Sequence, residues 1–283
     1  MGRRHGKRRE GPTLAEQADR HVLYQKSVQA PEAEVEFFDK AYRELRDGRK
    51  ALLMREDFCG TALLATTWCQ SDPERRAVGA DICADTLAWG REHNLGPAGE
   101  EVARRVELVE ADVREANLPL ADITCALNFS YCIFKTREEL REYFEAAHRG
   151  LKSDGLLILD LFGGTECQDE LEEETDIDDE PATYIWEHAS FNPIKNHIVC
   201  HIHFEFDDGS RLDKAFTYDW RLWSIPEITE LLGEAGFSKV HVYWEKFENT
   251  DDDDDELEGT GEYYRTEEVE NQESWMSYIV AEY

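Results

Sequence analysis

Residues 51–62 read Ala-Leu-Leu-Met-Arg-Glu-Asp-Phe-Cys-Gly-Thr-Ala, and this stretch is the strongest indication of the fold. An apolar run over 51–54 is followed by the acid Glu56, a turn around Gly60 and an apolar-rich helical segment over 62–68. A strand that brings an acid and a glycine to the edge of a sheet, directly before a helix, is typical of a nucleotide-type site. Glycine lets the backbone approach a ligand closely, and the helix N-terminus offers free N–H groups.

Four further strand patterns follow, with helical patterns between them. The second strand ends at Asp81, which lies 21 residues after Gly60, near the ~20 expected for an acid that reaches a ribose hydroxyl. The other three cover 106–113, 121–128 and 155–161, and an amphipathic helix over 137–151 begins with a Thr136–Glu139 capping box. Repeated alternation of strand and helix predicts a parallel sheet covered by helices on both faces.

The last third of the chain predicts a different arrangement. A capping box at Ser224 begins a helix that ends near Gly236, and strands over 239–244 and 275–280 follow it. Between the fifth strand and this helix, alternating stretches predict an antiparallel subdomain. The acidic runs at 168–180 and 250–258 are predicted to be loops. The alternating stretches cover 184–190, 197–206 and 213–222.

From about residue 50 to 283 the chain resembles the class I S-adenosylmethionine-dependent methyltransferases. Glu56 stands at the acid of that family's first motif, and Phe58, Gly60 and Ala62 stand at its three glycine positions. The Leu-Leu-x-x-Ala-Gly-Phe phrase at 231–237 is also common in the family. The resemblance implies an α/β fold: a seven-stranded Rossmann-like sheet, an antiparallel β insertion after the fifth strand and an N-terminal helical lid.

The resemblance also implies the cofactor, S-adenosyl-L-methionine, and its binding residues. Asp81 would bind the ribose diol, Ile82 would form an apolar wall of the adenine site, and Asp112 would face the adenine amino group beside the Val113 N–H. Residues 128–130 would lie under the methionine end. The full expected set is Glu56, Phe58, Cys59, Gly60, Thr61, Asp81, Ile82, Asp112, Val113, Asn128, Phe129 and Ser130.

The acceptor side is expected before and inside the sheet. A leading amphipathic helix over 31–45 would cover the cofactor, and Tyr24 and Gln29 are substrate candidates or simple packing residues. Arg221, a fixed cation in an aromatic stretch, suits a carboxylate or phosphate on the acceptor, or pairs with an internal acid.

No residue pattern marks a catalytic base. Because the sulfonium already activates the methyl group, catalysis is largely positioning. Candidates are Tyr24, Tyr131 and His201. His197, His201 and His203 could bind zinc, but no fourth ligand is evident, so we interpret them as a polar strand face and expect no metal.

Charge is the other strong feature of the chain. Its 283 residues include 31 basic and 63 acidic side chains, a net charge of −32. Such acidity indicates a halophilic protein adapted to high salt and argues against broad nucleic-acid binding. We expect no membrane span and no secretory signal, and the unpatterned cysteines indicate a reducing, cytoplasmic setting.

The predicted organisation is a disordered basic tail (1–11), a helical lid (12–48) and a methyltransferase domain (49–283). An acidic loop and the substrate-covering insertion occupy 163–223. The expected activity is methyl transfer to a small molecule. Alternatives are a protein or peptide methyltransferase, a non-catalytic cofactor-binding subunit, and an NAD-dependent oxidoreductase. The closing strands and the acid before the turn disfavour the last of these. The oligomeric state is left open.

Overall fold

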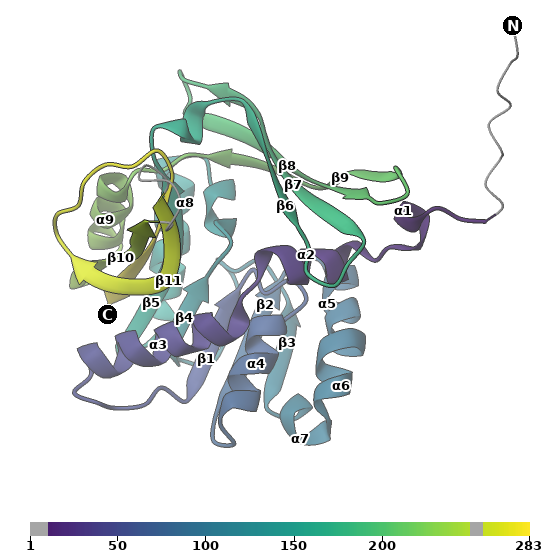
Figure 1. Ribbon diagram of the computed structural model, residues 1–283. Helices are drawn as coiled ribbons and strands as arrows, with labels where there is room; N and C mark the ends of the chain where they lie inside the picture. The colour runs from purple at the N-terminus through teal and green to yellow at the C-terminus, as the bar shows by residue number, and fades with distance from the viewer. Residues whose placement is uncertain (1–10, 250–256) are drawn as a thin grey trace, which may run out of the picture.

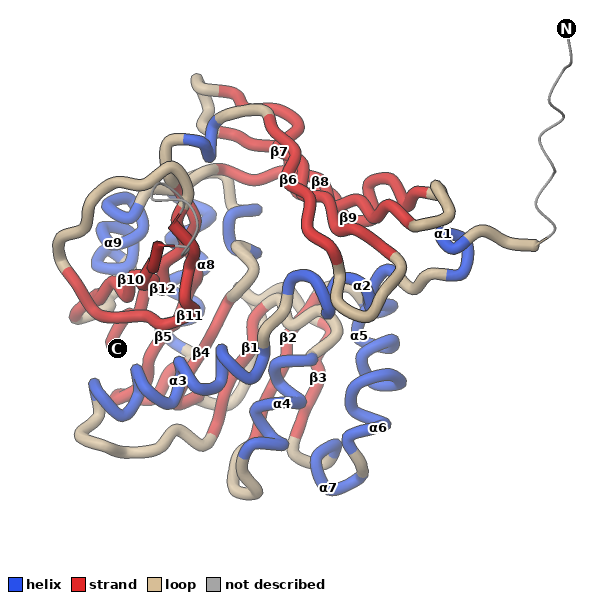
Figure 2. The backbone as a smooth tube through the Cα atoms, viewed as in Figure 1, coloured by secondary structure: helices blue, strands red, loops and turns tan. Residues whose placement is uncertain are grey.

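The computed structural model of the protein describes residues 11–249 and 257–283. Its central sheet has eight strands in the order β11-β10-β12-β5-β4-β1-β2-β3 (Figures 1 and 2). The strands β1 to β5 run parallel, and β12, β10 and β11 add antiparallel at one edge. Their bounds are β1 (Leu53–Asp57), β2 (Arg76–Asp81), β3 (Val106–Glu110), β4 (Ala121–Ala126), β5 (Leu151–Gly163), β10 (Lys239–Asn249), β11 (Leu257–Thr266) and β12 (Trp275–Glu282). The predicted α/β fold is confirmed.

The expected count of seven strands is wrong by one. The additional strand, β11, pairs with β10 at the edge of the sheet, where Tyr243 is opposite Arg265. An edge strand needs backbone partners on one side only, so its sequence need not carry a buried apolar pattern. Tyr263 of β11 is buried, and its ring lies 4.7 Å from that of Tyr278.

Two hydrophobic cores lie on the two faces of this sheet. Helices α3 and α4 pack on one face and contribute Phe38 and Trp68, both fully buried. Helices α8 and α9 pack on the other and contribute Phe144 and Leu231. The bounds of the α-helices are α1 (Leu14–Gln17), α2 (Arg20–Val28), α3 (Pro31–Leu45), α4 (Leu63–Ser71), α5 (Ala84–Gly90), α6 (Gly96–Ala98), α7 (Glu100–Ala103), α8 (Arg137–Arg149) and α9 (Ile225–Glu234).

Both predicted capping boxes are confirmed. At α8 the Thr136 hydroxyl accepts from the Glu139 N–H at 3.2 Å, and the Glu139 carboxylate accepts from the Thr136 N–H at 3.0 Å. At α9 Ser224 and Glu227 make the same exchange. These bonds satisfy N–H groups that the first turn of a helix leaves without partners, so each helix begins where the sequence predicts.

A second sheet of four antiparallel strands follows β5, as expected for the insertion, in the order β6-β7-β8-β9. Figure 1 shows it arched over the ends of the parallel strands, with α2 beneath it. Leu23 of α2 belongs to the same hydrophobic cluster as Ile202 and Phe204 of β8. The bounds are β6 (Leu171–Asp176), β7 (Ala182–Asn192), β8 (His197–Phe206) and β9 (Arg211–Arg221).

Part of the first acidic run forms a strand, although the whole run is predicted to be a loop. Residues 171–176, inside the run at 168–180, form β6, the edge strand that pairs with β7. Five of its six residues are exposed, so the carboxylates stay hydrated while the backbone completes the sheet. Residues 1–10, most of the predicted basic tail, and 250–256, most of the second acidic run, lie outside the described residues.

The N-terminal helices are tied to the insertion. The backbone N–H groups of Leu14 and Ala15 donate to Asp208 and Ser210 in the β8–β9 turn, at 3.2 and 3.1 Å. Lys26 of α2 forms an ion pair with Glu180 in the β6–β7 turn. Helix α2 is therefore held between the two sheets.

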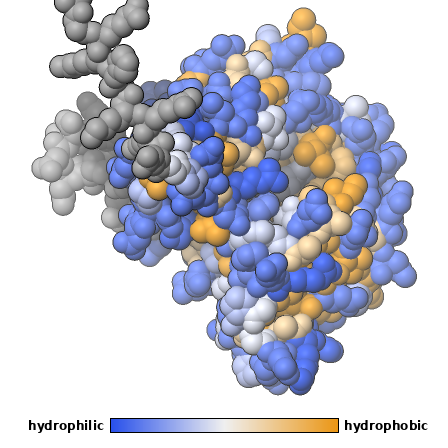
Figure 3. Space-filling view, turned by 90° about the vertical axis from the view of Figure 1, so that its right-hand side faces the viewer, coloured by the Kyte–Doolittle hydropathy of each residue, from blue (hydrophilic) through white to orange (hydrophobic). Residues whose placement is uncertain are grey.

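The surface is mostly polar. Figure 3 shows the side of the molecule that carries α1 and α5, where hydrophilic residues dominate and apolar residues form smaller patches. Within residues 11–249 and 257–283, no helix is long and apolar enough to cross a membrane.

Candidate active site

The turn after β1 adopts a conformation that normally favours glycine. Phe58, Gly60 and Ala62 have φ values of 60°, 51° and 55°. Glycine adopts this region without strain, whereas a residue with a Cβ is destabilised there by roughly 1–2 kcal/mol. The Phe58 ring lies 5.6 Å from that of Tyr143, and the Ala62 N–H donates to the Cys59 carbonyl at 2.7 Å. Packing and a tight turn therefore hold a glycine-like backbone at two positions that lack glycine.

Two predicted acids fix this turn from below. The Glu56 carboxylate accepts from the Ala65 N–H at 3.0 Å, in the first turn of α4. The two oxygens of Asp81 accept from the N–H groups of Gly60 and Cys83 at 2.9 and 2.8 Å. Burial raises the pKa of Glu56 well above its usual range, and the nearby Glu34 carboxyl raises it further.

A cavity of about 310 Å³ opens above this turn, at the carboxyl ends of β1, β2 and β4. This is where the strand order of an open α/β sheet reverses and ligands bind. We call it the central cavity. It is lined by Arg20, His21, Tyr24, Gln29, Glu34, Glu56, Asp57, Phe58, Cys59, Gly60, Thr61, Leu64, Asp81, Thr86, Leu127, Asn128, Ser130, Phe216 and Tyr218.

One part of its lining carries hydrogen-bond acceptors that lack donors. Glu34, in the first turn of α3, is 9% exposed, and its carboxyl has no ion-pair partner among the described residues. Burial, with the nearby Asp160 and Glu32 charges, raises its pKa to about 8. The side-chain oxygen of Gln29 is also buried without a partner. Since buried polar atoms are normally satisfied, the Gln29 oxygen is available to a donor on a ligand, and the Glu34 carboxyl lines the same cavity.

A second cavity, of about 230 Å³, lies under the four-stranded sheet. We call it the aromatic cavity. It shares Tyr24, Asn128 and Tyr218 with the central cavity. Its full lining is Tyr24, Val28, Asn128, Phe129, Glu173, Tyr184, Trp186, Ile202, Tyr218 and Trp220.

The floor between the two cavities is a strained turn. Asn128 and Phe129 have φ values of 54° and 55°. The buried Asp160 carboxylate accepts from both of their N–H groups, at 2.6 and 3.0 Å. Burial raises the pKa of Asp160 to about 7, although these two bonds favour its ionised form. Asp160 therefore positions the turn from beneath without lining either cavity.

Most of the predicted site residues come together. Tyr24, Gln29, Glu56, Asp81 and residues 58–61 line the central cavity, as do Asn128 and Ser130, while Phe129 lines the aromatic one. Ile82, Asp112 and Val113 line neither cavity. Ile82 follows Asp81 directly and is 74% exposed, and Asp112 forms a two-bond ion pair with Arg114.

Three candidates, Arg221 for the acceptor and Tyr131 and His201 for the catalytic base, line neither cavity. Arg221 donates to Glu227 at 2.8 Å and stacks over Trp223, so its charge is already paired. Tyr131 is fully buried, and its hydroxyl donates to the Asp160 carbonyl at 2.6 Å. His201 contacts Thr217 on the other face of its strand. Strand alternation explains two of these placements, because Arg221 and His201 point away from the face that carries Trp220 and Ile202. Arg221 therefore follows the second alternative, pairing with an internal acid.

Sequence reasoning missed several lining residues. Arg20 and His21 lie one helical turn before Tyr24, a spacing that places all three on one face of α2. Phe216, Tyr218 and Trp220 recur at every second position of β9, which places all three on one face of the strand. This two-residue period could have identified them from the sequence. No sequence pattern identified Glu34 as a lining residue, because acidic side chains are common in the first turn of a helix. No group of three or more metal-ligating side chains is present in the described part of the chain.

Comparisons with known proteins agree with this geometry. Residues 57–159 match a family described as "Methyltransferase domain". No curated protein matches the chain. Among solved structures, a S-adenosylmethionine-dependent methyltransferase from Clostridium acetobutylicum is 16% identical, with a TM-score of 0.64 over 92% of this chain and 96% of its own.

Two further structures are sugar-modifying enzymes. CalS10, an amino pentose methyltransferase from Micromonospora echinaspora, is 16% identical with a TM-score of 0.65, over 97% of this chain and 99% of its own. The sugar N-methyltransferase KedS8 from Streptoalloteichus is 16% identical with a TM-score of 0.60, over 100% of this chain and 98% of its own. At this identity the likeness is one of fold.

The domain match and the likeness of fold point in the same direction. Residues 57–159 match a methyltransferase domain family, and the whole chain shares the fold of S-adenosylmethionine-dependent methyltransferases.

Proposed function

We propose that the chain transfers the methyl group of S-adenosylmethionine to a small-molecule acceptor, with the cofactor in the central cavity and the acceptor in the aromatic cavity. The observation that carries this proposal is the shared wall of Tyr24, Asn128 and Tyr218. Molecules in the two cavities would meet there, and holding two reactants in contact supplies much of the rate of such a transfer.

The lining of the central cavity supports a cofactor orientation. Asp81 would accept from the ribose hydroxyls, and the exposed Ile82 side chain beside it would cover the adenine. Asp112 and the Val113 N–H, at the end of β3, would meet the adenine edge. At the opposite end Glu56, Gln29 and Glu34 line the cavity and would accept from the cationic amino acid part. The buried Gln29 oxygen has no partner in the protein, which favours a donor there.

The cofactor brings an activated methyl group, so the protein's own residues position reactants and exclude water. Helices α2 and α3 would act as the lid over 12–48, and the β6–β9 sheet would cover the acceptor. Burial and the neighbouring Tyr218 hold the pKa of Tyr24 well above its usual range. Its phenol therefore stays protonated at neutral pH and can donate a hydrogen bond at the junction.

Calorimetry with S-adenosylmethionine, S-adenosylhomocysteine and NAD tests the cofactor, and a labelled-methyl screen of cell extract tests the acceptor. We expect binding of the first two ligands only, and label in the small-molecule fraction. Label on macromolecules would favour a protein or peptide methyltransferase. Binding without release of S-adenosylhomocysteine under any condition would favour a non-catalytic subunit.

The setting of the reaction is part of the same proposal. All seven cysteines are unpaired thiols, which supports a reducing, cytoplasmic compartment. CalS10 and KedS8, which share this fold, are sugar methyltransferases, which supports a small acceptor.

A further inference from the structure

The inner face of the four-stranded sheet is an aromatic wall built by strand register. Glu173 of β6 pairs with Trp186 of β7, Trp186 with Ile202 of β8, and Ile202 with Phe216 of β9. Paired residues on adjacent strands share a face, so one row crosses the whole sheet. Tyr184, Tyr218 and Trp220 alternate with this row on the same face and also line the aromatic cavity.

Three rings form a corner inside this cavity. Tyr218 and Trp220 are stacked, with ring centroids 4.4 Å apart and planes at 27°. The Trp186 ring lies 5.9 Å from Tyr218 and 6.1 Å from Trp220, tilted by 46° and 40°. None of the three rings is exposed on the outer surface, and all three line the aromatic cavity. Their accessible ring faces are therefore available to a ligand inside the cavity.

The formal charge in the lining of this cavity is negative only. Glu173 is the only ionisable acid or base of Asp, Glu, Lys, Arg or His type in its described lining. Ring faces attract cations through their quadrupole and repel anions. An acceptor that carries a carboxylate or phosphate would therefore meet a carboxylate and ring faces, with no cation to pair with. This is the reverse of the acceptor chemistry that Arg221 suggested.

We propose that the aromatic cavity binds an organic amine, with its ammonium form held by Glu173 and the ring faces and its apolar body against Trp186 and Trp220. This inference rests on the proposed function, because it names the acceptor of that same site.

The transfer balances with the cofactor alone. The bound ammonium first loses one proton to water at the open side of the cavity, beside the exposed Glu173. The nitrogen lone pair then attacks the methyl carbon, the new C–N bond forms and the C–S bond breaks. The sulfonium sulfur takes that electron pair and becomes the neutral sulfur of S-adenosylhomocysteine, and the product leaves as an N-methylammonium.

Ligands with an apolar ring and a head group of different charge test the proposal. In the presence of saturating S-adenosylhomocysteine, quenching of tryptophan fluorescence reports binding of phenethylammonium, cyclohexylammonium, 2-phenylethanol and 3-phenylpropionate. We expect at least one ammonium to bind about tenfold more tightly than the alcohol, and the carboxylate to bind most weakly. With S-adenosylmethionine, labelled methyl should appear on an amine.

Glu173→Gln and Trp186→Leu should each remove most of the preference for ammonium over alcohol. The matched control is Glu174→Gln, because Glu174 is the next residue of the same exposed strand and points to the opposite face. It should leave the preference unchanged. Melting temperatures of all three variants show whether a loss is merely one of folding.

An equal affinity for alcohol and ammonium, a preference for the carboxylate, or an identical effect of Glu173→Gln and Glu174→Gln would overturn the inference. So would the absence of binding by both ammonium probes. If S-adenosylmethionine binds and label appears only on hydroxyl or carboxyl oxygens, the inference fails while the proposed function stands. If S-adenosylmethionine does not bind at all, the proposed function itself fails.

Discussion

At the scale of single residues, Asp81 connects the turn after β1 to the loop after β2. Its two oxygens accept from the Gly60 and Cys83 N–H groups, and the residue lines the central cavity. Close packing supports this connection, since a Cβ on Gly79 would lie 2.7 Å from the Cys59 sulfur. Glycine at that position lets β2 lie directly beside the turn.

Replacing this acid should weaken cofactor binding. The loss of a charged acceptor typically costs about 1.5–3 kcal/mol, roughly ten- to a hundredfold in affinity. We expect Asp81→Ala to weaken S-adenosylmethionine binding by that factor in calorimetry. Asp85→Ala, at an exposed acid in the first turn of α5 outside the cavity lining, is the control and should bind normally. Unchanged affinity in Asp81→Ala would refute our assignment of the ribose site.

Glu34 should make stability depend on pH. Its pKa of about 8 lies above that of a glutamate in the unfolded chain, near 4.3. Between these values the native state holds a proton that the unfolded chain has lost, so this group makes the free energy of unfolding fall as pH rises. The contribution is flat below the lower value and above the higher one.

Urea unfolding at pH 5 and pH 8 measures this effect. We expect Glu34→Gln to lose less stability between the two pH values than the unchanged protein. Asp160 and Glu56 also have raised pKa values, so part of the decline should persist. Glu36→Gln, an exposed acid of the same helix, should decline like the unchanged protein. Equal declines in Glu34→Gln and Glu36→Gln would contradict the assignment.

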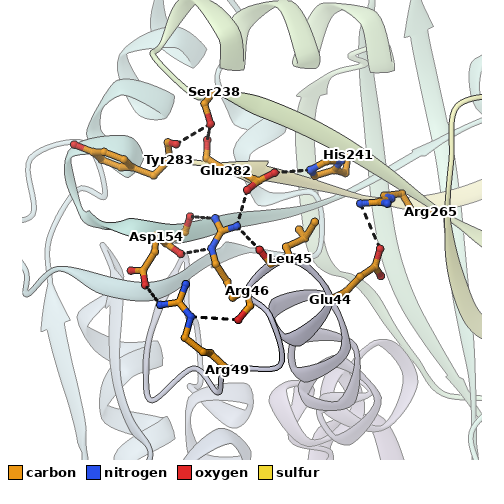
Figure 4. A network of polar contacts seen from close by, with 11 residues as sticks. Glu44, Leu45, Arg46, Arg49, Asp154, Ser238, His241, Arg265, Glu282 and Tyr283 are labelled. Carbon is orange, nitrogen blue, oxygen red and sulfur yellow. Dashed lines mark hydrogen bonds and ion pairs between the residues drawn. The ribbon is translucent and has the colours of Figure 1, made fainter.

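At the scale of elements, α3 is anchored to the sheet at its C-terminal end. Figure 4 shows the Arg46 guanidinium between the Glu282 carboxylate and the backbone carbonyls around Asp154. It donates to Glu282 at 2.5 Å and to the Asp154 carbonyl at 2.6 Å. His241 contacts the other oxygen of Glu282 at 2.8 Å. One buried ion pair thus joins α3 to β12, and it holds the helix whose first turn carries Glu34.

Removing this anchor should destabilise the fold strongly. Breaking a buried pair leaves an uncompensated charge and typically costs about 3–5 kcal/mol, whereas an exposed pair contributes about 0–1 kcal/mol. The Arg46 side chain is 8% exposed and that of Arg49, which pairs with Asp154, is 56% exposed. We expect Arg46→Met to lower the free energy of unfolding by the larger amount and Arg49→Met by the smaller one. Similar losses in both variants would show that burial does not set the strength of the anchor.

At the scale of the whole molecule, the net charge of −32 should make the fold sensitive to salt. Self-repulsion of such a charge destabilises the compact state, and salt shortens its range from about 10 Å at 0.1 M to about 3 Å at 1 M. We expect the melting temperature to rise steeply between dilute buffer and molar potassium chloride. A flat or falling curve would leave the acidity without a high-salt explanation.

Much of this architecture could be predicted from the sequence because its signals are local. The apolar period of α3, the capping boxes of α8 and α9, and the acids that end β1 and β2 each depend on residues within a few positions of one another. Parallel strands then bring Glu56 and Asp81 to one edge of the sheet, since their carboxyl ends meet there. The β6 and β11 edge strands escaped prediction because hydrogen bonds to the neighbouring strand, not a buried apolar pattern, make them strands.

Local patterns in the sequence suffice for the parallel core, the order of its strands along the chain and the acids at their ends. What the second sheet faces depends instead on how the elements pack in space. Alternation shows that Trp220 and Arg221 lie on opposite faces of β9, but not which face covers the cavity. In the folded protein the aromatic face of β9 points inward, and Arg221 forms an ion pair with Glu227. The fold also places the Glu34 carboxyl near enough to Glu56 to raise the pKa of Glu56. Such contacts depend on how elements pack in space, which no local pattern encodes.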